Sequence, residues 1–305
     1  MPSTALILGC GYLGRRLAAR LVDRGQTVYA TTRSPDKARQ LAGLGARPLL
    51  VHITQPVTLA ALTPVLAADG LDVYHMIPPG RPGQSPSPRQ VVLGGIAHMV
   101  KALRRAARVR RAILVSSTAV YGQHDGQLVD ADTPPDPVDE RGKLLLEGEH
   151  LWLQAGDAYH VLRLAGLYGP GRVIGLAAVH QGAPLLGNPQ ALLNLIHVDD
   201  AAALLHAFAD ADAPGRIELG CDGHPVPRID YYNHLARLLG VDPPAVLDAD
   251  AAARQFPGIR LNLDRLRRSS SKALDNIATC RRTHWRPQFP NYRQGLDDAL
   301  ARSRE

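Results

Sequence analysis

Short apolar runs recur at regular intervals through the first half of the chain, and longer mixed stretches separate them. The apolar runs predict β-strands over residues 4–9, 27–31, 48–52, 72–77, 111–116 and 158–163. The stretches between them predict helices over residues 12–24, 35–43, 57–67, 89–107 and 140–155. A helix between successive strands implies right-handed crossovers and a parallel sheet that is covered on both faces. The pattern therefore predicts an α/β fold, a Rossmann-type doubly wound parallel sheet.

The alternation becomes irregular after Arg172. A helix over 200–210 follows the pair Asp199-Asp200, and beyond Pro214 come a short strand over 216–219, a helix over 229–239 and a proline-punctuated tail. This tail is too small and irregular for a core of its own. We therefore expect a dinucleotide-binding Rossmann domain over 1–171, to which 190–212 returns, and a smaller substrate or cap region made of 172–189 and 213–305.

The run Gly9-Cys10-Gly11-Tyr12-Leu13-Gly14 lies between the first strand and the first helix. The first glycine permits the tight turn, the second lets pyrophosphate approach the backbone, and the third lets the helix lie close to the sheet. A pyrophosphate would then meet the positive end of the helix dipole. The alternative is a plain glycine-rich turn. In this context, we expect Gly9, Gly11, Tyr12, Leu13 and Gly14 to bind a dinucleotide.

The end of the second strand decides which dinucleotide is expected. An NAD site usually has Asp or Glu there, but this chain has Thr32 and Arg33, and no carboxylate comes before Asp36. Arg33, with Lys37 one turn further on, favours a 2′-phosphate, so NADP is expected and NAD is the alternative. Arg33 could also be one more surface arginine. Pro78 opens a loop rich in Pro, Gly and Ser at the carboxyl edge, where ligand loops belong, so it joins the cofactor residues.

Composition narrows the class of protein. The net charge of +7 comes almost entirely from arginine, and the densest basic stretch, Lys101 to Arg111, carries no interleaved aromatics, so it is read as a solvated helix face and no nucleic acid is expected. The three cysteines are isolated, which predicts neither a metal site nor a disulfide framework and favours a reducing compartment. No apolar run approaches membrane-spanning length, and no signal peptide is expected. These observations predict a cytoplasmic protein without a membrane partner.

Four segments resemble a known family in the family's own order. Residues 115–122 (VSSTAVYG) look like its "SSxxVYG" segment, 162–172 (LRLAGLYGPGR) like "RLAGIYGPGR", and 196–200 (IHVDD) like "IHVDD". The ending His284-Trp285-Arg286-Pro287, followed by residues 292–296 (YRQGL), resembles "GWxP…xxxGL". The chain is thus identified as similar to the extended short-chain dehydrogenases, the NAD-dependent epimerase/dehydratase family. The missing active-site tyrosine, described next, makes it resemble their atypical subgroup.

The resemblance implies a catalytic set of Ser or Thr followed by Tyr-x-x-x-Lys. It places Ser117 at the hydroxyl that polarises the substrate oxygen, and Lys143 at the lysine that holds the nicotinamide ribose and lowers the pKa of the tyrosine. It also adds Leu167 to the cofactor residues. A turn residue at position 117 and a solvated lysine at position 143 are the alternatives. The tyrosine itself is missing, because Asp139 stands four residues before Lys143.

An ionised aspartate does not donate a proton at neutral pH, so Asp139 does not replace the phenol. Other groups near the carboxyl edge are Tyr121, Tyr168 and His197 as further proton donors and Arg172 as an anion-binding residue, and we give these four as substrate residues. A structural role is the alternative for the two tyrosines and the histidine, and the one that we favour over catalysis. Two functions follow. The first is an NADP-dependent oxidoreductase, epimerase or dehydratase that acts on a hydroxyl or ketone of a sugar nucleotide or small metabolite. The second is a non-catalytic NADP-binding sensor or partner-binding protein. We favour the enzyme, and the family's usual pairing predicts a homodimer.

Overall fold

The computed structural model describes residues 3–256 and 271–303. Its centre is a seven-stranded sheet with the strand order β12-β7-β5-β4-β1-β2-β3. Every pairing in it is parallel. The strands are β1 (Thr4–Leu8), β2 (Thr27–Thr32), β3 (Arg47–Leu50), β4 (Leu71–His75), β5 (Val109–Ser117), β7 (Tyr159–Leu164) and β12 (Ile217–Gly220). The order reverses beside β1, which makes the crevice between β1 and β4 the expected ligand position of such a sheet.

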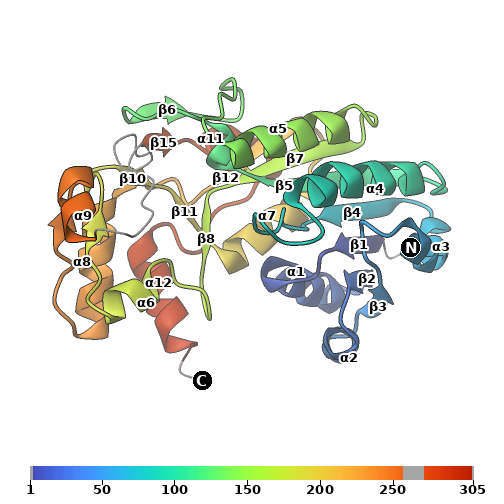
Figure 1. The fold of residues 1–305 in the computed structure, drawn as a ribbon. Helices are drawn as coiled ribbons and strands as arrows, with labels where there is room; N and C mark the ends of the chain where they lie inside the picture. The colour runs from blue at the N-terminus through green and yellow to red at the C-terminus, as the bar shows by residue number, and fades with distance from the viewer. Residues whose placement is uncertain (1–2, 257–270, 304–305) are drawn as a thin grey trace.

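Helices cover both faces of the sheet (Figure 1). Side chains alternate between the faces along each strand, so Ala5 and Ile7 of β1 join one core while Leu6 and Leu8 join the other. The first core is closed by α1 (Tyr12–Asp23) and α7 (Val198–Asp210), and the second by α3 (Thr63–Leu66), α4 (Gly95–Leu103) and α5 (Glu140–Leu153). The remaining helix of this part is α2 (Pro35–Gly43). The doubly wound sheet predicted from the apolar pattern is confirmed.

Three predicted elements differ from the structure. The strand predicted at 216–219, assigned to the cap region, is β12, and it pairs with β7 as the edge of the main sheet. The helix predicted over 57–67 is a 3-10 helix, η1 (Pro56–Leu62), followed by the short α3. The helix predicted over 89–107 begins with a π turn, η2 (Gln90–Gly94), and its α-helical part ends at Leu103. The boundary at 213 was therefore wrong, because the chain returns to the sheet beyond it.

A second group of elements forms the smaller lobe. Its short strands pair as β8 (Gly166–Tyr168) with β11 (Leu195–His197), β10 (Leu192–Leu193) with β13 (Val226–Pro227), β9 (Leu185–Leu186) with β14 (Val246–Leu247), and β6 (Gln127–Val129) with β15 (Lys272–Leu274). Its helices are α6 (Leu176–His180), α8 (Arg228–Leu239), α9 (Ala249–Gln255) and α12 (Tyr292–Ala301). A third core, which includes Tyr168, Tyr231 and Leu296, holds this lobe together. The helix α11 (Ile277–Thr283) packs against α7 and β12.

Asp200 ties the C-terminal segment to the Rossmann part. Its carboxylate is buried in the first turn of α7 and accepts hydrogen bonds from the backbone amides of Gln288 (2.7 Å) and Phe289 (2.9 Å). The neighbouring Asp199 instead binds Arg16 of α1 at 2.9 Å and Arg302 at 2.7 Å. The acidic pair of the "IHVDD" segment therefore holds three parts of the chain together. None of the helices in the described ranges has the length and apolar character of a membrane span.

Candidate dinucleotide and active site

The glycine loop has the geometry that a dinucleotide-binding turn requires. Gly9 has a φ of +81°, and a Cβ built on it would lie 2.7 Å from the side chain of Ile77. A Cβ on Gly14 would lie 3.2 Å from the Gly9 carbonyl oxygen and 3.3 Å from the Ile7 side chain. A side chain at position 9 would strain the turn, and one at position 14 would push α1 away from β1.

The N-terminus of α1 is left open beside this loop. Its N-cap residue, Gly11, has no side chain to bond the first amides, and the first turn contains no acidic residue. The first amides of a helix have no intrahelical partner, and the helix dipole is positive at this end. This uncapped terminus, next to a loop with no room for a Cβ at Gly9, fits a pyrophosphate group. A dinucleotide bound here would be held by the backbone of the Gly9–Gly14 loop.

A cavity of about 590 Å³ lies at the carboxyl ends of β1, β2 and β4. Five of the residues that the sequence assigns to the cofactor line it: Gly9, Gly11, Arg33, Lys37 and Pro78. Its far wall comes from residues that the sequence did not single out, among them His52, Thr54, Gln84 and Ser85. Among the described residues, the wall therefore carries two cationic side chains close to the end of β2 and no carboxylate.

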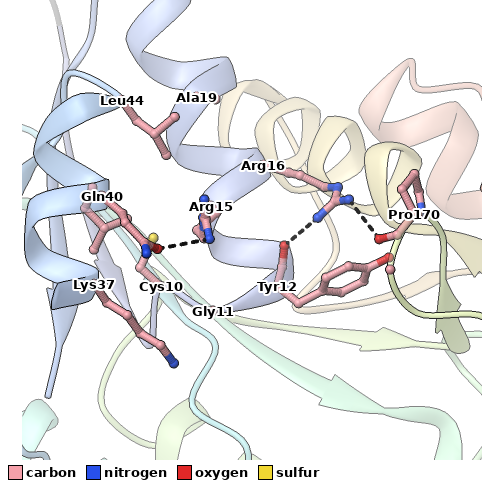
Figure 2. Close-up of a pocket in the computed structure, with 12 residues that line it drawn as sticks. Cys10, Gly11, Tyr12, Arg15, Arg16, Ala19, Lys37, Gln40, Leu44 and Pro170 are labelled. Atoms are coloured by element: carbon pink, nitrogen blue, oxygen red, sulfur yellow. Dashed lines mark hydrogen bonds between the residues drawn. The ribbon is translucent and has the colours of Figure 1, made fainter. Parts of the chain in front are cut away.

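A second cavity, of about 520 Å³, adjoins the first and shares Cys10, Gly11 and Lys37 with it. Figure 2 shows Arg15 of α1 and Gln40 of α2 facing each other across it, with a hydrogen bond of 3.3 Å from Nη1 to Oε1. Arg16 does not face Gln40; its guanidinium donates hydrogen bonds to the carbonyl oxygens of Tyr12 and Pro170. Arg15 thus adds a cation beside Lys37 that the sequence reading missed, although it directly follows the last glycine of the motif.

Of the other residues expected to bind the cofactor, only Tyr12 lines one of the two cavities with its side chain. The Leu13 side chain is buried in the core, so Leu13 has only its backbone to offer the ligand. The Tyr12 ring lines the second cavity and lies under the Arg16 guanidinium, 4.4 Å from the ring centroid. Lys143 and Leu167 line neither cavity. Leu167 is half-buried in β8, opposite Ile196 of β11.

Ser117 ends β5 at the carboxyl edge, opposite Leu164 of β7. Its hydroxyl accepts a hydrogen bond of 3.2 Å from the Ala119 amide and so caps the 3-10 turn η3 (Thr118–Val120). The side chain is half-buried. A hydroxyl that accepts one bond still has its own proton to donate. Ser117 therefore keeps the donor that polarisation of a substrate oxygen requires.

The start of α5 contains Asp139, the residue at the position of the family's tyrosine. Asp139 is the N-cap of this helix, and its Oδ1 accepts a hydrogen bond of 2.7 Å from the Gly142 amide. Lys143 is exposed, and its ammonium lies 3.0 Å from Oε1 of Glu140. The carboxylate of Asp139 therefore stabilises the helix end, as N-cap acids do. The neighbouring Lys143 is paired with an acid of its own helix turn.

Tyr121, expected at the substrate, lies in the core and not on the wall of either cavity. It is 2% exposed, its hydroxyl donates to the Asp130 carbonyl oxygen at 2.9 Å, and it accepts from Arg163 Nη1 at 2.7 Å. Arg163 also forms a buried ion pair with Glu149, at 2.7 Å, and Glu149 accepts from the Ser116 hydroxyl. Burial raises the pKa of the Tyr121 phenol although Arg163 opposes it. The hydroxyl of Tyr121 is thus fully used inside the fold.

Tyr168 and His197 are also buried, each with no exposed surface. Neither side chain is therefore placed to contact a substrate, contrary to the expectation. Their rings form a T-shaped contact, edge to face, at a centroid distance of 5.4 Å. His197 lies near Asp199 and Asp298, and the three offer ligand atoms within 4.8 Å of one another. Arg302 binds both of these carboxylates and Arg16 also binds Asp199, so two cations already balance the two carboxylates of the cluster. Arg172 is exposed, with its guanidinium 5.8 Å from the Tyr12 ring centroid.

Lys272 is a site residue that the sequence reading missed. It belongs to β15, is only 7% exposed, and its ammonium donates a hydrogen bond of 2.8 Å to the Tyr121 carbonyl oxygen. Burial lowers the pKa of Lys272 to about 8, although the Asp139 carboxylate pulls the other way. The ammonium therefore lies on the same segment that begins with Ser117.

Asp222 is a second unexpected buried group, just beyond β12. One of its oxygens accepts from the His224 amide, and the other, Oδ2, has no hydrogen-bond partner among the described residues. Burial raises the pKa of Asp222 to about 7. The unfolded carboxyl loses its proton near pH 4, so between about pH 4 and pH 7 the folded state binds more protons and its stability falls as the pH rises.

Replacing Asp222 by asparagine should therefore stabilise the protein at pH 8. Asparagine has the same shape and no charge to bury, and we expect a gain of about 2 kcal/mol in the free energy of unfolding. Urea unfolding of both proteins at pH 8 and pH 5.5 measures it. The gain should shrink at pH 5.5, where wild-type Asp222 is neutral in the folded state. An equal difference at both pH values would contradict this origin.

Comparison with known proteins agrees with the dinucleotide-binding fold described above. A model of the NAD dependent epimerase/dehydratase family matches residues 5–220. Protein YeeZ of Escherichia coli (strain K12) is 30% identical over 293 residues, which cover 93% of this chain and 96% of YeeZ. The 3-diazoavenalumate denitrifying reductase of a Streptomyces species is 26% identical over 298 residues, which cover 94% of this chain and 96% of the reductase.

A solved structure shares the fold. The structure of a functionally unknown conserved protein from Silicibacter pomeroyi DSS has a TM-score of 0.78 and 31% identity, and the match covers 98% of each chain. The resemblance read from the four motif segments is thus confirmed. The chain belongs to the NAD dependent epimerase/dehydratase family, which makes it an NAD(P)-dependent enzyme of the epimerase, dehydratase or reductase type.

Proposed function

We propose that this protein is an NADP-dependent oxidoreductase that acts on a hydroxyl or ketone of a small metabolite or sugar nucleotide. The observation that carries the choice of NADP is the wall of the larger cavity. Arg33 and Lys37 line it where β2 ends, and none of the described lining residues offers a carboxylate to a ribose 2′-hydroxyl. A guanidinium and an ammonium are the groups that bind a 2′-phosphate. Arg15, across the shared wall from Lys37, adds to the positive field.

When bound, the nicotinamide supplies or accepts a hydride at the substrate carbon. The residues of this chain would do the rest. The backbone of the Gly9–Gly14 loop would hold the pyrophosphate, and Ser117 would donate a hydrogen bond to the substrate oxygen as negative charge gathers there. Lys143 would leave Glu140 to bind the nicotinamide ribose. The Streptomyces relative is named a reductase, which supports reduction over epimerisation.

The first test compares the two cofactors. We expect NADPH to bind more tightly than NADH, and Arg33→Asp to weaken NADPH by at least about tenfold, or 1.4 kcal/mol, with little effect on NADH. Titration followed by intrinsic fluorescence measures all four affinities.

Arg39→Asp is the matched control, because Arg39 lies on α2 but lines neither cavity and pairs with Asp36 on the surface. It makes the same change of charge nearby and should leave the preference for NADPH intact. Equal affinities for NADPH and NADH in the unmodified protein would exclude the NADP assignment.

The second candidate function is a non-catalytic NADP sensor. The use of the Asp139 carboxylate as a helix cap favours it, because the family's proton donor is absent from this position. Tight NADPH binding without turnover of any ketone or sugar nucleotide would support the sensor.

A homodimer through α4 and α5 stays a prediction. The basic stripe of the first helix is exposed; it consists of Lys101, Arg104, Arg105 and Arg108. The two acids of α5 that could form ion pairs with this stripe in a partner subunit already have partners. Glu149 is buried with Arg163, and Glu147 already pairs with Arg89 at 3.0 Å. The acids that could have matched this basic stripe across a two-fold axis are therefore engaged within the same chain.

A further inference from the structure

The active-site segment that begins at Ser117 is enclosed from two sides. On one side the first turn of α5 packs so closely that a Cβ on Gly142 would lie 2.6 Å from the Ala119 carbonyl oxygen. On the other side β15 brings the Lys272 ammonium to 2.8 Å from the Tyr121 carbonyl oxygen. The Asp139 carboxylate at the start of α5 interacts electrostatically with the Lys272 ammonium and raises its pKa. Lys272 is thus a buried acid–base group beside the position of the missing tyrosine.

The fold holds Lys272 there firmly. Its strand pairs in parallel with β6, Lys272 opposite Gln127, and its carbonyl oxygen accepts from Asn194 Nδ2 at 2.8 Å. The side chain of Asn194 also accepts from the Leu274 amide at 2.9 Å. Two separate parts of the chain, β6 and Asn194, therefore fix the backbone on which the ammonium stands. A surface lysine would need no such framework.

We propose that Lys272 takes the role of the missing tyrosine, as the group that gives a proton to the substrate oxygen and takes it back in the reverse reaction. This assignment rests on the proposed function. In the reduction, the hydride brings its electron pair from the reduced nicotinamide to the carbonyl carbon, which is reduced while the nicotinamide is oxidised. The C=O π pair becomes an O–H bond as an Nζ–H bond of Lys272 breaks. The neutral amine then recovers a proton from water.

The surroundings tune Lys272 for this exchange. Burial lowers its pKa to about 8, and the Asp139 carboxylate at the start of α5 keeps it from falling further. Of the described residues on the elements beside β15, Gln127 pairs with Lys272 across the strands and Asn194 bonds the Lys272 carbonyl oxygen, and both are uncharged. The Tyr121 phenol is turned into the core toward Arg163. A donor whose pKa lies near the working pH exchanges protons most efficiently, whereas an ordinary lysine holds its proton too tightly.

The first experiment needs no substrate. Four lysines give four signals in protein labelled with [ε-13C]lysine, and single substitutions to arginine assign them. We expect the Lys272 signal to titrate near pH 8, and Asp139→Asn to lower this midpoint because it removes the opposing charge. Asparagine also caps helices, so this variant keeps the start of α5 intact. A Lys272 midpoint near pH 10.4, the ordinary value for lysine, would overturn the proposal.

The second experiment follows NADPH oxidation at 340 nm with 9,10-phenanthrenequinone and a panel of ketones. Lys272→Met should lower kcat by about a hundredfold or more, and Lys272→Arg nearly as much, because arginine keeps the charge but does not release a proton. The wild-type kcat for reduction should fall above pH 8, and this break should be absent from the arginine variant. Lys101→Met, an exposed lysine of α4, should behave like wild type.

The outcomes separate the two proposals. An arginine variant with wild-type kcat and pH profile would show a structural role for Lys272 and overturn the donor assignment alone. Retained NADPH affinity and an unchanged thermal transition in each variant establish that a loss of rate is not a loss of folding. A wild-type protein that binds NADPH but reduces neither the quinone nor any ketone would overturn the proposed function, and the donor role with it, whatever the Lys272 midpoint.

Discussion

Replacing Arg163 by methionine is expected to lower the free energy of unfolding by about 3–5 kcal/mol. Arg163 is 1% exposed and Glu149 is fully buried, and the guanidinium is the partner of that carboxylate in the core. Methionine fills much of the same space but leaves the Glu149 charge without compensation in a medium where it is poorly solvated. It also removes the hydrogen bond from Arg163 to the Tyr121 hydroxyl. Denaturant unfolding at pH 7 measures the loss.

Two further variants serve as controls for the Arg163→Met measurement. Arg216→Met breaks an exposed ion pair with Asp157 and should cost less than about 1 kcal/mol, since surface pairs contribute little. The double variant Glu149→Met with Arg163→Met removes both charges and should lose less than the sum of the two single variants. A single Arg163→Met variant as stable as Arg216→Met would contradict an energetic role for the buried pair.

Replacing Ser117 by alanine is expected to lower kcat for carbonyl reduction by about a hundredfold. Ser117 stands at the carboxyl end of β5 and retains a hydroxyl proton to stabilise the charge that develops on the substrate oxygen. Loss of one such donor typically costs a hundred- to a thousandfold. The measurement is steady-state NADPH oxidation with any ketone that the wild-type protein reduces.

Ser117→Thr is the matched control, because it keeps the hydroxyl and adds only a methyl group. It should retain most of the rate, and both variants should bind NADPH like the wild type. Alanine also removes the bond that caps η3, which by itself would cost stability and not kcat. Equal rates for alanine and serine at this position would leave Ser117 as a turn residue, the alternative reading of the sequence.

The parts of the fold that the sequence predicts well are those with local signals. The three glycines of the first loop have one physical explanation each, and the structure bears out the tight turn at Gly9 and the close packing at Gly14. The inner strands are apolar runs because both faces of a parallel sheet are buried. The edge strand β12 was misplaced because only four residues pair, and nothing local distinguishes the main sheet from a cap.

The site was harder to predict because side-chain direction depends on distant contacts. Tyr121 lies within a motif segment, yet its ring turns into the core toward Arg163, 42 residues further along the chain. Lys272 stands among polar residues that read as an exposed loop, and its burial follows from pairing with β6, far back in the sequence. Similarly, His197 looked available as a polar residue near the carboxyl edge but is packed between Tyr168 and Phe289. No periodicity in the sequence reports such long-range contacts.

The two amide bonds that Asp200 accepts have a consequence for how the chain unfolds. Because residues 288 and 289 are bound to the first turn of α7, this stretch belongs physically to the Rossmann core, while α12, which follows it directly, packs in the smaller lobe. Neither lobe is a continuous length of chain, so no single cut yields two intact folding units. The molecule should therefore melt in one cooperative step, with both lobes gained and lost together.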